Sequence, residues 1–240
     1  MAVNLVKGEN TVLKDMNIFH VGLGWDVNEG ASPFDFDLDV AAFMIGSNKK
    51  TLADDYLVFY NSEKRLKVDA YEIERNKDNK RQWAGSRNLI KPLKIVLSNL
   101  WNDNEAMRNE SRPVDPELSV IGSVDDEDGQ TSEDGDDETM DIDLSKVRSD
   151  VQEIIINVSI YEYQKRKQNF GQVERAYVRL YKPGHEKEGA EEYRYDLTED
   201  FSTCASIEFC RLYRYNCEWK IQALGIGHKG GLEELVSKFM

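Results

Sequence analysis

The sequence predicts an all-β protein, a two-sheet antiparallel β-sandwich with a few short helices, one of them at the C-terminus. Short runs rich in Val, Ile, Tyr and Phe recur along the 240 residues, and turn-forming Gly, Asn and Asp separate them. Several of these runs alternate between apolar and polar side chains, as half-buried strands do. Many short, two-faced strands are typical of a sandwich and not of a parallel α/β sheet.

Eight runs are the clearest strand candidates. They are Phe19–Gly24, Phe36–Ile45, Tyr56–Tyr60, Glu153–Tyr161, Ala176–Tyr181, Glu191–Leu197, Ser206–Tyr213 and Glu218–Leu224. In the seventh run, alternation places Ile207, Phe209 and Leu212 on the inward face, which requires a slip in the period near Cys210. Two sheets whose inner faces carry such residues would form the core.

Two stretches are predicted to be helical. Asn169–Glu174 fits a short turn of helix before a strand. At the C-terminus, Leu232, Leu235, Val236 and Phe239 have the spacing of one face of a helix, so this segment should pack its apolar side on the sandwich.

The chain is predicted to form a single domain over residues 1–240, with a partly ordered insertion over approximately 64–124. Within it, Ala70–Gln82 is highly charged, whereas Leu89–Trp101 is apolar enough to pack. This insertion is interpreted as a partner-binding element.

The chain is predicted to be cytoplasmic, with no transmembrane segment. No apolar run reaches the length of about 18 residues that a membrane helix needs. Met1–Asp15 lacks the apolar core of a secretory signal. Cys204, Cys210 and Cys217 form an odd set without a CxxC pair, which favours reduced thiols.

Nearly all of the net charge of −14 lies in one tract. Between Pro113 and Ser145 there are thirteen acidic residues and no Lys or Arg. Such a tract repels phosphate groups, so the sequence argues against a nucleic-acid partner.

The first candidate site is the run from Phe34 to Val40, in which every second residue is acidic. On a strand, Asp35, Asp37 and Asp39 share one face, and the apolar residues between them share the other. Like charges about 7 Å apart repel unless something positive lies between them. Calcium fits, because it takes six to eight oxygen ligands in irregular geometry. Lys or Arg partners, or solvent, would offset this repulsion equally well, and the sequence pattern does not distinguish among them.

The second candidate site is Asp134–Glu138, which opens into an alternating strand from Met140. Gly135 allows a tight backbone on which neighbouring carboxylates could converge. Asp26 is a third possible contributor. Neither cluster has Gly at the sixth position of the loop, as an EF-hand requires, so a calcium site would need segments distant in sequence.

Signatures of an enzyme are few. His20, His185 and His228 adjoin no Ser or Cys nucleophile motif. Gly225–Gly230 matches GxGxxG, but a dinucleotide-binding unit would need a further strand beyond Met240. Aspartate pairs could perform acid–base chemistry, and their spacing does not separate that from metal ligation.

Taken together, a set of ordered motifs resembles the tellurium-resistance TerD family. These motifs are Gly22-Leu-Gly-Trp-Asp26, Phe36-Asp-Leu-Asp39, Phe59-Tyr-Asn61, Asp134-Gly-Asp-Asp-Glu138, Ser159-Ile-Tyr161, Phe170-Gly-Gln-Val173, Tyr195-Asp-Leu197, Leu212-Tyr-Arg214, Glu218-Trp-Lys220 and Ala223-Leu-Gly225. They extend to about Gly227 in the order of the family. The chain departs from the family where about 70 residues separate Phe59-Tyr-Asn61 from the acidic loop.

The resemblance implies a β-sandwich that holds calcium (Ca2+) at one end through acidic loops. It also implies a cytoplasmic stress-response protein of the tellurite-resistance type, without enzymatic activity and acting through protein partners. The ligand set implied for this sequence is Asp26, Asp35, Asp37, Asp39, Asp136, Asp137 and Glu138. Two alternatives stay open: a metal-dependent hydrolase that uses the same acids, and a metal-free acidic adaptor.

Overall fold

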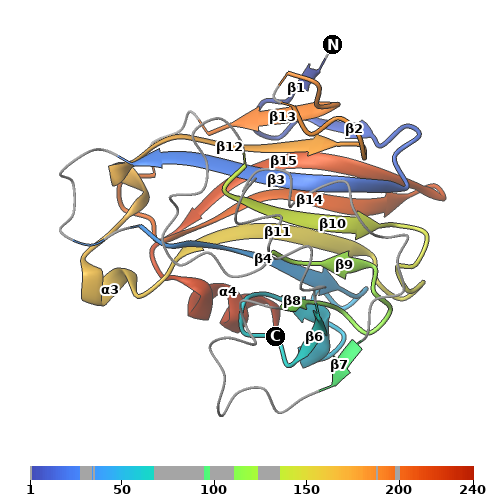
Figure 1. Cartoon of the computed structure of the whole chain (residues 1–240), viewed down its shortest axis with the longest axis horizontal. Coiled ribbons are helices and arrows are strands. Elements are labelled where there is room, and N and C mark those ends of the chain that lie inside the picture. Colours follow the sequence, from blue (N-terminus) through green and yellow to red (C-terminus); the bar gives the residue numbers. More distant parts are fainter. Residues whose placement is uncertain are drawn as a thin grey trace.

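The structure is a computed structural model that describes residues 2–27, 34, 36–67, 95–97, 111–123, 136–187, 189–197 and 201–240. It is a sandwich of two six-stranded sheets, here called sheet A and sheet B, with a small third sheet at one side (Figure 1). The predicted all-β sandwich is confirmed. Within these residues, no helix is long and apolar enough to cross a membrane.

Sheet A has the strand order β1-β13-β12-β3-β10-β9. Its strands are β1 (Val3–Asn4), β3 (Ile18–Val27), β9 (Val120–Ile121), β10 (Glu138–Asp143), β12 (Val173–Tyr181) and β13 (Tyr193–Asp196). All pairs are antiparallel except β1 with β13. The central strand β3 therefore lies between β12 and β10, and this position decides which side chains meet on its outer face.

Sheet B has the strand order β2-β15-β14-β11-β4-β5 and is antiparallel throughout. Its strands are β2 (Asn10–Val12), β4 (Leu38–Ile45), β5 (Leu57–Val58), β11 (Glu153–Ile160), β14 (Ser206–Tyr215) and β15 (Glu218–His228). The strand predicted over Tyr56–Tyr60 is shorter, because a 3₁₀ turn over Asp54–Tyr56 precedes it.

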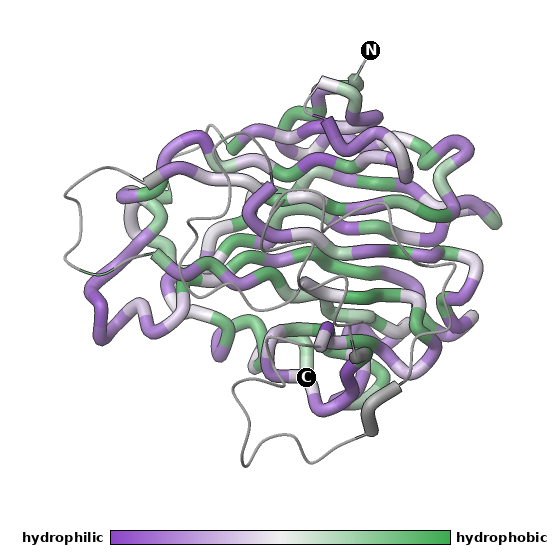
Figure 2. The backbone as a smooth tube through the Cα atoms, viewed as in Figure 1, coloured by the Kyte–Doolittle hydropathy of each residue, from purple (hydrophilic) through white to green (hydrophobic). Residues whose placement is uncertain are grey.

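The main core lies between the two sheets and follows the predicted alternation, which Figure 2 shows as alternating colours along the strands. Ile207, Phe209 and Leu212 are all in this core. The expected slip near Cys210 is a shift in the register of β14 and β15 between Glu208 and Cys210. The register shift changes the step of the inward–outward alternation, so the apolar residues before it and after it both point into the core.

The helices are short. The 3₁₀ turn at Phe170–Gln172 lies within the segment predicted to be helical, and α3 (Tyr163–Arg166) was not predicted. The C-terminal helix α4 (Leu232–Phe239) is confirmed, and it buries Leu235 and Phe239 in a second core on the outer face of sheet B.

Part of the predicted insertion forms a three-stranded sheet of β6 (Lys64–Lys67), β7 (Ile95–Leu97) and β8 (Ser111–Pro113), in the order β7-β6-β8. Residues 68–94, 98–110 and 124–135 lie outside the described residues, and with them Ala70–Gln82 and most of Leu89–Trp101. The single domain with an insertion over about 64–124 stays a prediction.

The three cysteines are free thiols, and burial raises the pKa of the Cys210 thiol to about 12.

Candidate functional site

One end of the sandwich brings together the end of β3 and the beginnings of β4 and β10; we call this end the acidic rim. Glu138 Oε2 accepts a hydrogen bond from Val40 N at 2.8 Å, which joins the two sheets. Asp137 Oδ2 accepts one from Trp25 N at 2.8 Å. The two neighbouring carboxylates thus satisfy backbone donors of two other strands, β3 and β4.

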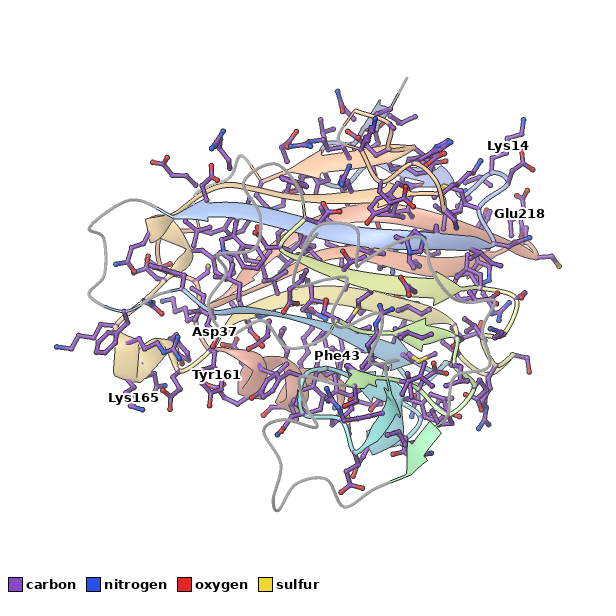
Figure 3. The ribbon with its side chains drawn as sticks, viewed as in Figure 1. Lys14, Asp37, Phe43, Tyr161, Lys165 and Glu218 are labelled. Carbon is purple, nitrogen blue, oxygen red and sulfur yellow. The ribbon has the colours of Figure 1, made fainter. Side chains whose placement is uncertain are left out.

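Asp37 and Asp39 lie on the other side of β4 from Phe36, Leu38 and Val40, which are in the main core. The predicted two-faced pattern is therefore confirmed for these residues. Asp39 is 4% exposed, and Asp37 is 9% exposed and lies 3.6 Å from Arg166 Nη2. Figure 3 labels Asp37 near Tyr161, whose backbone N donates to the Asp37 carbonyl at 2.9 Å. Asp35 lies outside the described residues.

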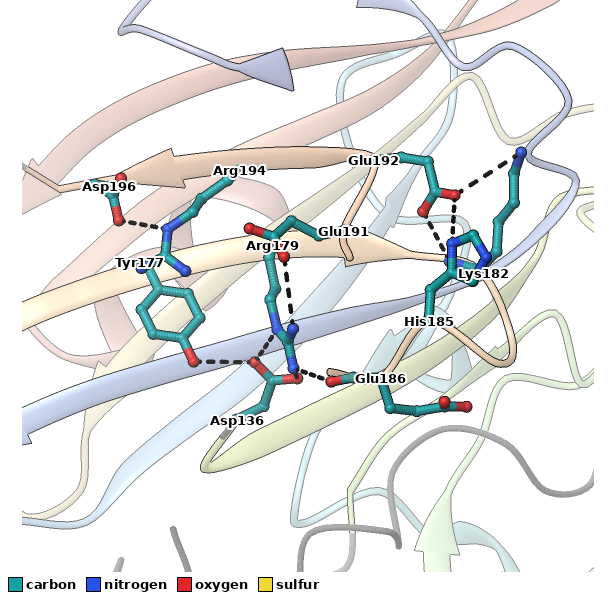
Figure 4. A network of polar contacts seen from close by, with 10 residues as sticks. All are labelled: Asp136, Tyr177, Arg179, Lys182, His185, Glu186, Glu191, Glu192, Arg194 and Asp196. Atoms are coloured by element: carbon teal, nitrogen blue, oxygen red, sulfur yellow. Dashed lines mark hydrogen bonds and ion pairs between the residues drawn. The ribbon is translucent and has the colours of Figure 1, made fainter. Parts of the chain in front are cut away.

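Asp136 lies on the outer face of sheet A, where Arg179 binds it with two hydrogen bonds (Figure 4). Arg179 Nε is 2.7 Å from Asp136 Oδ1, and Arg179 Nη2 is 2.9 Å from Asp136 Oδ2. The Tyr177 hydroxyl donates to Asp136 Oδ1 at 3.2 Å. Burial acts to lower the pKa of Arg179, but the hydrogen bonds and charge of Asp136 outweigh it, and the pKa is raised. The Asp136 carboxylate is therefore neutralised by an arginine.

Two glycines of β3 make room for this pair. A Cβ on Gly22 would lie 2.1 Å from Asp136 Oδ2, and a Cβ on Gly24 would lie 2.4 Å from the Tyr177 ring. Because Gly22 lies between Arg179 on β12 and Thr139 on β10, the Arg179 side chain can cross β3 to reach its partner. The glycines at positions 22 and 24 are therefore what allows Asp136 and Tyr177 to lie directly against β3.

Asp26 is ion-paired with Arg175, and its side chain is 42% exposed. Of the seven predicted ligands, Asp26, Asp37 and Asp136 are thus each ion-paired with an arginine. Asp37, Asp39, Asp137 and Glu138 lie at the acidic rim. Within the described ranges, no three His, Cys, Asp or Glu side chains come together in a group that could hold a metal ion.

The donor chemistry of the acidic rim nevertheless fits calcium. Its side chains offer carboxylate oxygens, the ligands that this hard cation takes. Asp37, Asp39 and Glu138 are at most 9% exposed. Buried carboxylates are costly unless positive charge offsets them, and a divalent cation is one way to supply that charge.

A second group of buried charged side chains was not predicted from the sequence. His20 Nδ1 lies 2.7 Å from Asp141 Oδ1, and Arg112 Nη1 lies 2.6 Å from Asp141 Oδ2. Burial alone would raise the pKa of Asp141, but Arg112 and His20 together lower it. Because His20 and Asp141 are directly paired between β3 and β10, their contact depends on strand register, which alternation within each strand does not give.

The chain is similar to proteins of known family. The model of the TerD domain matches residues 1–100 and 111–239. Tellurium resistance protein TerD of Serratia marcescens is 34% identical over 244 residues, covering 100% of this chain and 97% of that protein. General stress protein 16U of Bacillus subtilis is 30% identical over 243 residues, with coverages of 100% and 97%.

Solved structures agree on the fold. A homologue of telluride resistance protein (TerD) from Streptomyces coelicolor A3(2) matches with a TM-score of 0.53 at 14% sequence identity, covering 91% of this chain and 94% of that one. With the family model matching nearly the whole sequence and full-length relatives above 30% identity, the chain belongs to the TerD domain family of tellurium-resistance and stress-response proteins.

Proposed function

We propose that the protein is a non-enzymatic, calcium-binding member of this stress-response family that acts through protein partners. The observation that carries the calcium proposal is the burial of Asp37, Asp39 and Glu138 at the acidic rim, where two sheets meet. Asp26, Asp37, Asp39, Asp137 and Glu138 would supply the described carboxylates, and calcium would offset their negative charge. Asp35 remains part of the predicted ligand set.

The proposal narrows the ligand set at Asp136. Its arginine partner, Arg179, is buried and bonds both carboxylate oxygens, whereas Arg175 and Arg166, the partners of Asp26 and Asp37, are more exposed. A carboxylate whose two oxygens both accept from a buried guanidinium is less available to a metal ion. We therefore assign Asp136 a structural role and keep Asp26 and the rim acids as the calcium ligands.

The hydrolase alternative has less support. His20 and Asp141 form a His–Asp pair of the kind that catalytic dyads use, but His20 is 1% exposed. Its Nε2 atom has no hydrogen-bond partner among the described residues, so no nucleophile is placed next to it there. General acid–base catalysis requires contact with a substrate, which a base buried in this way does not have.

Thermal unfolding with added calcium or EDTA tests the proposal. Calcium should raise the melting temperature, because it binds the folded state. Asp37→Asn and Asp137→Asn should each reduce the rise in melting temperature that calcium causes. Asp136→Asn should lower the melting temperature without calcium but leave the calcium-induced rise unchanged. Asp196→Asn, at a half-exposed side chain paired with Arg194, is the matched control for loss of one charge.

A melting temperature that calcium and EDTA leave unchanged would overturn the calcium proposal and favour the metal-free adaptor. A response lost equally in Asp136→Asn and Asp137→Asn would return Asp136 to the ligand set.

A further inference from the structure

A cleft of about 310 Å³ lies between α3 and the N-terminal end of α4, beside the last residues of β11. Three tyrosines line it: Tyr60, Tyr161 and Tyr163. Asp39 and Ser159, which are both more than nine-tenths buried, belong to the same lining. The cleft thus combines aromatic walls with buried polar groups, the usual composition of a small-molecule site.

The aromatic rings stand at an angle to one another. The Tyr60 and Tyr161 ring centroids are 5.9 Å apart, and the ring planes make an angle of 89°. The guanidinium carbon of Arg166 lies 5.2 Å from the Tyr161 centroid. One ring of this cleft therefore already contacts a cation of the protein itself, as the negative face of an aromatic ring favours.

The charge of the lining is negative. Asp39, Glu162 and Glu233 contribute three carboxylates and Lys165 one ammonium group, a net charge of −2, which becomes −1 when the Arg166 guanidinium beside Tyr161 is included. Lys165 Nζ is 2.9 Å from Glu162 Oε2, so the ammonium is held by a carboxylate at the edge of the cleft. The lining accordingly favours a positively charged ligand.

The backbone on one side of the cleft is strained. Glu162 and Lys167, the residues that flank α3, have φ values of 47° and 54°. Residues other than glycine are uncommon in this left-handed region, and such strain concentrates at ligand sites. Glu162 stands between Tyr161 and Tyr163, two of the tyrosines that line the cleft.

We propose that this cleft binds an organic cation, a primary ammonium or guanidinium group that packs against the tyrosines and donates hydrogen bonds to the carboxylates. Three tyrosine rings suit the alkyl part of such a ligand better than a hydrated metal ion. The group could belong to a free amine or to a Lys or Arg side chain of a protein partner. This inference goes beyond the calcium proposal and shares only the Asp39 carboxylate with it.

Calorimetric titration with cadaverine and agmatine, in EDTA and again in calcium, tests the inference. Gly-Gly-Lys-Gly-Gly and Gly-Gly-Arg-Gly-Gly present the same groups as side chains. Tyr161→Leu and Glu233→Gln should each weaken binding by about fivefold. Tyr215→Leu and Glu218→Gln remove an exposed tyrosine and an exposed glutamate at the far hairpin and should change binding less than about twofold (Figure 3).

The titrations distinguish a free amine from a Lys or Arg side chain of a protein partner. Binding of the free amines supports a small-molecule ligand, and binding of the peptides alone supports a partner side chain. Absence of binding by all four probes, or equal binding by wild type and Tyr161→Leu, overturns the inference. Both cleft substitutions lie at exposed residues, and melting curves will establish that the variants fold. The calcium response should persist in Tyr161→Leu, so the two proposals can fail separately.

Discussion

The outer face of sheet A is covered through polar and charged contacts, whereas the outer face of sheet B is covered by the apolar side of α4. On sheet A, Arg179, Asp141 and His20 are each at most 5% exposed. On sheet B, Leu235 and Phe239 of α4 pack on Phe43, and the Phe43 and Phe239 rings are 5.0 Å apart. The covered part of each face is buried mainly by charged pairs on sheet A and mainly by apolar packing on sheet B.

The difference predicts different responses to substitution. An apolar face loses stability in proportion to the area and volume removed, and a neighbour can relax into the space. A buried ion pair responds more sharply, because removing one partner leaves the other charged and buried. The two faces should therefore differ most when a single charge is removed from sheet A.

The largest effect is expected for Arg179→Met. Asp136 would keep its carboxylate in a buried site without its guanidinium partner, which should lower the free energy of unfolding by about 3–5 kcal/mol. Urea denaturation measures the loss. Arg175→Met is the matched control, because the exposed Arg175 pairs with the part-exposed Asp26 and should contribute about 0–1 kcal/mol. Equal losses in the two variants would contradict the description of sheet A.

A smaller effect is expected for Leu235→Ala on the other face. Leu235 is fully buried between α4 and sheet B, and its truncation should cost about 2–3 kcal/mol, because a terminal helix can partly collapse into the space. Ile226→Ala, at a residue that is 40% exposed, is the control. If loosening α4 exposes the apolar face of sheet B, the variant should also bind more of a hydrophobic dye than wild type.

How much of this structure could be predicted depends on the range of the interactions. The strand at Glu153–Tyr161 and the apolar face of the C-terminal helix were predicted almost residue by residue, because periodicity is a local property of the sequence. The two-residue strand β1 and the four-residue helix α3 were missed, since neither is long enough to show a period.

The site was predicted in its composition but not in its partners. Alternation gave the shared face of Asp37 and Asp39, yet it gave no sign that Arg179 would bind Asp136. That pair forms across three strands, and register between strands does not follow from the pattern within one. The spacing of Gly22 and Gly24 was the available signal, because two glycines on one strand face leave room for bulky side chains from a neighbouring strand.

The smallest effect concerns the polar contacts that hold α4 in place on sheet B. His228 Nε2 lies 2.5 Å from Glu208 Oε1, His228 Nδ1 lies 3.3 Å from Glu234 Oε1, and Lys238 is ion-paired with Glu208. The hydrogen bond to Glu208 raises the pKa of His228, although burial opposes it. Both ring nitrogens can donate only when the imidazole is protonated.

A group whose pKa is raised on folding stabilises the protein fully below its unfolded pKa, here about 6.5, and loses that contribution as the pH rises through the folded pKa. The stability difference between wild type and His228→Gln should therefore be largest below about pH 6.5 and should shrink above it. Urea denaturation across this range measures the difference, with His185→Gln at an exposed histidine as the control. A difference that stays constant with pH would mean that protonation of His228 does not help to hold α4 on sheet B, which would sharpen the contrast between the two faces of the sandwich.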